Sequence, residues 1–234
     1  MEKELTKRQK NHLSLGLYCN YFIHGFALVI LAQNILSLAS SWMTTVAVVS
    51  YVISGIGIGR LIAYPITGAL ADRLSRKMFV YIGMLCYLIF AIGMVVTHQI
   101  VIAYGLAILA GIANSALDAG TYTTLVEIND GEGQSTVLLK AFMSVGEFIL
   151  PLIVTYLAGH GFWFGWSFVI MAGLILLNLV NMLFLQFPQP NMVVQSNQFN
   201  ATNLTGGRKL LATISLVGYG YTSNGLNDFV YAMD

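Results

Sequence analysis

Six long apolar runs, separated by short polar turns, constrain this chain more than any other feature of its sequence. A helix needs about 20 apolar residues to cross the hydrocarbon core of a bilayer. Hydrophobic residues make up 57% of the chain and charged residues only 9%, whereas about 25% of the residues in a soluble domain are charged. The sequence therefore predicts an all-α membrane protein.

The apolar runs also predict how the chain is divided. We expect a leader at residues 1–12, a six-helix transmembrane bundle at 13–187, a polar linker at 188–209 and the start of a truncated seventh span at 210–234. Within the bundle, the expected spans are residues 13–39, 43–71, 78–97, 100–128, 136–158 and 162–187.

The basic residues lie mainly at one side of these spans. Of eleven Lys and Arg, four lie in the leader, three in the loop after the second span and two in the linker. By the positive-inside bias, this pattern predicts a multi-pass protein of the cell membrane with a cytoplasmic N-terminus. The sequence lacks metal-ligand spacing, a nucleophile elbow and a phosphate-binding glycine loop, so we expect no enzyme activity, no cofactor and no nucleic-acid partner.

The loop between the second and third spans carries a motif. It reads Gly68-Ala69-Leu70-Ala71-Asp72-Arg73-Leu74-Ser75-Arg76-Lys77. This decapeptide resembles the loop signature G-x-L-A-D-R-x-G-R-K of the major facilitator superfamily, with Ser75 at a position that is usually glycine. In that family the loop controls the rocking of two six-helix halves, so the resemblance implies a gating role for its matching residues. These are Gly68, Asp72, Arg73, Arg76 and Lys77.

The same resemblance implies a central cavity between two halves that are related by an axis along the membrane normal. The sequence supplies one half, a linker and one further span. We therefore expect that the C-terminal half of a chain about twice as long is missing, since the family has this two-half architecture.

Four ionisable residues lie in the middles of the predicted spans: His24, Arg60, Asp118 and Glu147. At a helical rise of about 1.5 Å per residue, each lies about 14 to 18 Å from the cytoplasmic end of its span. Ionisable groups inside a membrane are costly and usually face a bundle interior or a water-filled cavity. The common depth predicts a shared polar site.

We predict that Asp118 or Glu147 takes up the coupling proton, because an intramembrane carboxylate can be protonated as its exposure changes. Helical spacing extends the site along each span. The predicted solute contacts are Arg60, Asn114, His24, Asn20, Tyr64 and Tyr122. Two alternatives remain open. Arg60 fits a structural ion pair with either carboxylate equally well, and His24 fits a histidine held by a neighbouring hydroxyl or amide.

Together, these features predict a secondary active transporter, a permease for proton-coupled uptake (symport) of a small polar solute, a sugar or organic anion. Drug/proton antiporters of the superfamily carry an arginine on helix 4 and a G-x-x-x-G-P run on helix 5. Here the fourth span has no arginine, and Leu150 replaces the second glycine of the run that starts at Gly146. The alternatives are efflux of a drug or metabolite by proton antiport, and a membrane sensor or assembly partner that does not transport.

Overall fold

The computed structural model describes residues 6–71, 75–129 and 133–188, which belong to one compact unit. Its elements are α1 (Lys7–Gln33), α2 (Ile35–Ser41), α3 (Val46–Ala71), α4 (Arg76–Val96), α5 (Ile100–Leu117), the π-helical turn η1 (Asp118–Tyr122), α6 (Thr123–Ile128), α7 (Gly133–Gly159) and α8 (Gly165–Leu183). Six helical stretches of the described residues are long and apolar enough to cross a membrane. The prediction of an all-α, six-span membrane protein is confirmed.

The first predicted span differs from the structure at both of its ends. Helix α1 begins earlier, at Lys7, because Thr6 and Gln9 form a capping box that satisfies backbone N–H groups at its start. Near the other end, Asn34 separates α1 from α2. The Asn34 amide donates to the Ile30 carbonyl oxygen at 2.8 Å and to Ser167 Oγ at 3.1 Å. Asparagine commonly interrupts helices through such bonds to the backbone.

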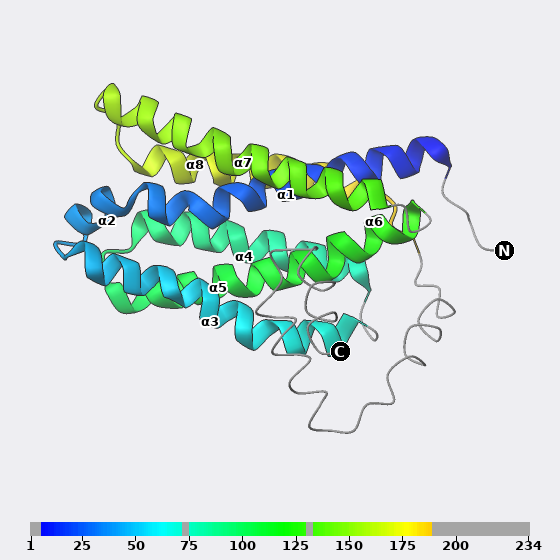
Figure 1. The fold of residues 1–234 in the computed structure, drawn as a ribbon, viewed down its shortest axis with the longest axis horizontal. Coiled ribbons are helices and arrows are strands. Elements are labelled where there is room, and N and C mark those ends of the chain that lie inside the picture. The colour runs from blue at the N-terminus through cyan, green and yellow to red at the C-terminus, as the bar shows by residue number, and fades with distance from the viewer. Residues whose placement is uncertain (1–5, 72–74, 130–132, 189–234) are drawn as a thin grey trace, which may run out of the picture. The chain divides into compact units, whose positions relative to one another are not determined.

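The helices form two groups, with α5 packed against α3 and α4, and α1 packed against α7 and α8 (Figure 1). Contacts between α4 and α8 join the groups. Matching the first three spans in order with the last three pairs α1 with α5, α3 with α7 and α4 with α8. The α1–α7 contact then corresponds to the α5–α3 contact, and the α1–α8 contact to the α5–α4 contact. This is the relation expected of two inverted three-helix repeats within one half of a transporter.

Glycine pairs make the closest crossing in each group. A Cβ atom added to Gly25 of α1 or to Gly146 of α7 would lie 2.1 Å from a backbone oxygen of the other helix. In the second group, a Cβ atom on Gly59 of α3 or Gly111 of α5 would lie 2.1 or 2.2 Å from a backbone oxygen of its partner. A side chain at any of these four positions would therefore push the two backbones apart.

Several predicted features lie outside the described residues. These are Asp72 and Arg73 of the loop motif, almost all of the linker and the seventh span. Gly68 is described as part of α3, while Arg76 and Lys77 open α4.

Candidate functional site

The π-helical turn η1 interrupts the fourth span at Asp118. Two threonine hydroxyls donate to backbone carbonyl oxygens in this turn, from Thr123 to Ala119 at 2.5 Å and from Thr124 to Gly120 at 2.6 Å. Threonine hydroxyls form such bonds to the carbonyl four residues earlier, and these bonds often bend helices. Single π turns inside α-helices are frequent at functional sites.

The turn also separates Asn114 from Tyr122, the two predicted solute contacts on this span. Asn114 is 1% exposed, whereas Tyr122, which lies beyond Asp118, is 43% exposed. A π turn contains more residues than an α turn, so side chains spaced for an α-helix no longer share one face after it. Asn114 and Tyr122 therefore lie in different surroundings.

Two tyrosine hydroxyls hold the Asp118 carboxylate from two other spans. Tyr21 of α1 donates to Oδ1 at 2.5 Å, and Tyr64 of α3 donates to Oδ2 at 2.5 Å. Hydrogen bonds to a charged group contribute about 1.5 to 3 kcal/mol each. The carboxylate thus joins α1, α3 and η1 at one point.

Arg60 reaches this carboxylate through Tyr64. Its Nη2 atom donates to the Tyr64 hydroxyl at 3.1 Å, and the guanidinium carbon lies 5.6 Å from the centroid of the Tyr64 ring. Within the described part of the chain, Arg60 makes no direct ion pair with Asp118 or Glu147. The tyrosine is therefore a spacer between the arginine and the carboxylate.

A second cation lies over the ring of Tyr21. The Lys140 ammonium of α7 is 5.9 Å from the centroid of the Tyr21 ring. The order of groups from α3 to α7 is Arg60, Tyr64, Asp118, Tyr21 and Lys140. We refer to these five residues as the Asp118 chain.

His24 packs beside this chain. It is 3% exposed, and its ring stacks on Tyr21 with 5.3 Å between the ring centroids. Its Nδ1 atom lies 3.4 Å from the hydroxyl of Tyr87, on α4. Such a contact is expected if His24 is a structural histidine that is held by a neighbouring hydroxyl.

The two predicted asparagines are buried within the described bundle. Asn20 is 2% exposed, and its Oδ1 accepts a hydrogen bond of 2.7 Å from Asn178 of α8. Both amide atoms of Asn114 are buried and have no hydrogen-bond partner among the described residues. Asn114 therefore has bonding capacity that an additional polar group could use.

Glu147 and Tyr122 do not join the Asp118 chain. Glu147 is half-buried on α7 and makes no hydrogen bond or ion pair with another described residue. Tyr122 is among the exposed aromatic residues. The structure thus connects Asp118, Arg60 and Tyr64 directly and leaves these two predicted residues apart.

Two aromatic residues that contact the site were missed by the sequence prediction. Tyr21 and Tyr87 carry no charge, and aromatic residues in apolar spans are usually packing residues. A signal for Tyr21 existed, because it precedes His24 by three positions and so shares a helix face with it. Tyr87 had no comparable signal, since the third span contains no ionisable residue in its middle.

At the end of the bundle where α4 begins, Arg76 forms an ion pair with Glu127 of α6. The next residue, Lys77, places its ammonium over the rings of Tyr81 and Phe187, at 5.6 and 5.9 Å from their centroids. The described part of the loop motif therefore contacts the fourth span, through Arg76, and the residues after α8, through Lys77.

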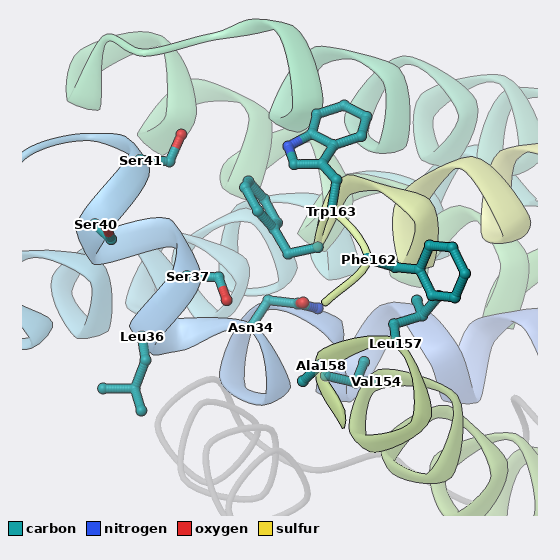
Figure 2. Close-up of a pocket in the computed structure, with 11 residues that line it drawn as sticks. Asn34, Leu36, Ser37, Ser40, Ser41, Val154, Leu157, Ala158, Phe162 and Trp163 are labelled. Carbon is teal, nitrogen blue, oxygen red and sulfur yellow. The ribbon is translucent and has the colours of Figure 1, made fainter. Parts of the chain in front are cut away.

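A separate pocket lies between α2 and the turn from α7 to α8 (Figure 2). Its volume is about 620 Å³. Its polar lining comes from Asn34, Ser37, Ser40 and Ser41, and its apolar lining from Leu36, Val154, Leu157, Ala158, Phe162, Trp163 and Phe164. None of these residues is charged, in contrast to the Asp118 chain.

A model of the Major Facilitator Superfamily matches residues 17–233. The chain belongs to the major facilitator superfamily. It is a multi-pass membrane protein of a transporter family, and the family implied by the loop motif is confirmed. Its membership also agrees with the inverted arrangement of the six helices.

Similar major facilitator proteins come from two bacteria. The chain is 46% identical over 176 residues to "Inner membrane transport protein YdiM" of Escherichia coli (strain K12), covering 75% of this chain and 44% of that protein. It is 42% identical over 175 residues to "Uncharacterized MFS-type transporter YfkL" of Bacillus subtilis (strain 168), covering 74% of this chain and 44% of the relative. The chain spans a little under half the length of these relatives.

The fold also resembles a solved structure, "Crystal structure of peptide transporter POT (E310Q mutant) in complex with sulfate". The TM-score is 0.61 at 17% sequence identity, and the match covers 94% of this chain and 48% of that chain. This likeness shows the fold alone.

Proposed function

We propose that this chain provides the N-terminal half of a secondary active transporter that takes up a small polar solute together with protons, by alternating access. Its superfamily and the names of its relatives support a transport function. The observation that carries the proton coupling is the Asp118 carboxylate, which is held in the middle of a span by tyrosines from two other spans. Intramembrane carboxylates with such partners commonly mark proton pathways.

The hydrogen bonds around Asp118 suggest how a proton would act. An ionised carboxylate only accepts hydrogen bonds, so it can bind both tyrosine hydroxyls at once. When one oxygen is protonated it gains an O–H donor and becomes a weaker acceptor, so the hydrogen bond from the tyrosine at that oxygen is weakened. Because Tyr21 lies on α1 and Tyr64 on α3, protonation would alter a contact between spans and so bias their packing.

The solute contacts proposed for this mechanism are Arg60, Asn114 and His24. Arg60 and Asn114 have unused donors or acceptors among the described residues. Asn20, Tyr64 and Tyr122 remain proposed lining residues.

We place the gate and the N-terminus on the cytoplasmic side. Basic residues Lys7, Arg8, Arg76 and Lys77 open α1 and α4, and an even number of crossings separates these two helix starts. The positive-inside bias favours the cytoplasm for that end. The ion pair between Arg76 and Glu127 would connect the gating loop to the span that carries Asp118.

Asp118→Asn in the full-length protein tests the coupling role. In energised vesicles we expect proton-driven accumulation of the solute to be abolished, while exchange of solute across the membrane continues. Glu147→Gln is the matched comparison, and it should retain accumulation because Glu147 lies outside the Asp118 chain. Unchanged accumulation in Asp118→Asn would reject Asp118 as the coupling residue, and its loss in Glu147→Gln alone would assign that role to Glu147.

The direction of transport is tested in the same vesicles. Uptake by symport predicts that an imposed inward proton gradient raises the internal concentration of the solute above the external one. Exclusion of the solute under that gradient would identify efflux by antiport instead.

A further inference from the structure

The Asp118 chain contains two cations and one carboxylate. Arg60 donates to the Tyr64 hydroxyl, which donates to Asp118, and the Lys140 ammonium lies over the ring of Tyr21, whose hydroxyl also donates to Asp118. Arg60, Lys140 and Asp118 together carry a formal charge of +1. The part of the chain that the structure describes gives neither cation an ion-pair partner.

The Tyr64 spacer leaves most of the guanidinium free. One guanidinium nitrogen, Nη2, donates to the Tyr64 hydroxyl, and no other hydrogen bond from Arg60 to a described residue is formed. A guanidinium presents five donors in a planar fork that matches the two oxygens of a carboxylate. An arginine in the middle of a span needs such a partner, because an unpaired charge there is costly.

We infer that the transported solute is a singly charged organic anion, whose carboxylate binds Arg60 while Lys140 offsets the charge of Asp118. This inference rests on the proposed transport function. The other groups that face Asp118 are the hydroxyls of Tyr21 and Tyr64, with His24 stacked on Tyr21 and Tyr87 beside it.

The charge balance points to the same solute class. Arg60, Lys140 and Asp118 sum to +1 when all three are ionised. A monoanion that enters with one proton leaves this sum unchanged, whereas a neutral sugar with one proton raises it to +2. Moving no net charge through the low-dielectric interior of the membrane avoids a large desolvation cost. The anion and its proton therefore cross together without net charge.

The test uses the full-length protein in liposomes that contain a pH-sensitive dye. The probes are matched pairs of solutes that differ chiefly in a carboxylate: glucuronate with glucose, gluconate with sorbitol, and 3-hydroxybutyrate with 1,3-butanediol. We expect internal acidification with at least one carboxylate and with no neutral partner, at a rate that an imposed potassium diffusion potential does not change. Protein-free liposomes correct for passive permeation of the acids.

Different outcomes overturn different claims. Acidification by a neutral solute, or a rate that follows the membrane potential, overturns the anion inference and leaves proton-coupled transport standing. No acidification with either member of any pair counts against the proposed transport function itself.

Variants of Arg60 test the contact. Arg60→Lys keeps the charge but loses the fork, so we expect the half-saturating carboxylate concentration to rise about tenfold, the lower end of what a hydrogen bond to a charge contributes. Arg60→Gln should raise it further. Arg8→Gln, an exposed arginine on the first turn of α1, is the matched control. An Arg60→Gln variant with unchanged half-saturation would overturn the inference even if its transport rate fell.

Discussion

The α1–α7 pair and the α3–α5 pair have the same backbone packing and different chemistry. Each pair crosses at two glycines whose backbones come too close for a Cβ atom. The α3 and α7 helices also each contain an internal proline, Pro65 and Pro151, shortly after the crossing glycine. Packing that matches so closely in the two repeats indicates that the crossings serve the fold common to both.

The polar residues are distributed unevenly between the same two pairs. The α3–α5 pair contains Arg60 and Tyr64, and Asp118 follows directly after α5, in η1. Hydrogen bonds join these three residues. The α1–α7 pair contributes Tyr21, which donates to the other oxygen of this carboxylate, and Lys140, whose ammonium lies over the Tyr21 ring. The close glycine crossings are therefore duplicated in the two repeats, whereas the charged residues are not.

The largest expected effect comes from breaking the two crossings. Gly59→Ala and Gly146→Ala would each force a pair of helices apart, at a cost of about 1 to 3 kcal/mol of stability for overpacking. If the pairs are equivalent in packing, the two variants should lower the thermal unfolding midpoint of the detergent-solubilised, full-length protein by similar amounts.

The chain offers matched controls for this prediction. A Cβ atom on Gly57 of α3 or Gly105 of α5 would meet no atom of the described residues within 4 Å. Gly57→Ala and Gly105→Ala should therefore leave the midpoint unchanged or raise it, because alanine favours helix more than glycine does. Equal midpoints for Gly59→Ala and Gly57→Ala would show that the crossing does not limit stability.

The second largest expected effect concerns the two tyrosines that bind Asp118, one from each helix pair. Tyr64→Phe and Tyr21→Phe each remove one hydrogen bond to Asp118. We expect the initial rate of proton-coupled uptake to fall about tenfold in Tyr64→Phe, in keeping with the loss of a hydrogen bond to a charge. The fall should be smaller in Tyr21→Phe, because only Tyr64 also holds Arg60.

Uptake rates in vesicles measure this difference, with Tyr156→Phe as the control at an exposed position of α7. A greater loss in Tyr21→Phe than in Tyr64→Phe would reverse the assignment, making the α1 side of the carboxylate the more important one.

The smallest expected effect concerns the ion pair between Arg76 and Glu127, which lies at the start of α4. Its counterpart in the second repeat, the start of α8, carries aromatic residues and no charge. Both side chains of the pair are about one-fifth exposed, at 20% and 18%. We expect a coupling energy of about 1 kcal/mol.

A double-mutant cycle measures this coupling energy from the unfolding midpoints of Arg76→Gln, Glu127→Gln and the double variant. If the two single effects simply add, the ion pair contributes nothing measurable to the stability of this repeat.

Much of the candidate site could be predicted from the sequence because charges are rare in apolar spans. Asp118 and Arg60 stand out on this ground alone, and the helical period then adds Tyr64. The same reasoning could not find Lys140 as a partner, since it lies near the start of its span, where lysines are common. It also grouped Glu147 with Asp118, because depth along a helix says nothing about the direction in which a side chain points.

The sequence by itself determined the class of fold, since only helices can satisfy the backbone of six such apolar runs in lipid. It also determined the family, through the loop motif at residues 68–77. Only the tertiary structure decided which charges meet. Rotation of each helix about its axis is set by packing against its neighbours, above all at the four crossing glycines. The π turn at Asp118 then sets the direction of the carboxylate. No periodic pattern in the sequence predicts that turn.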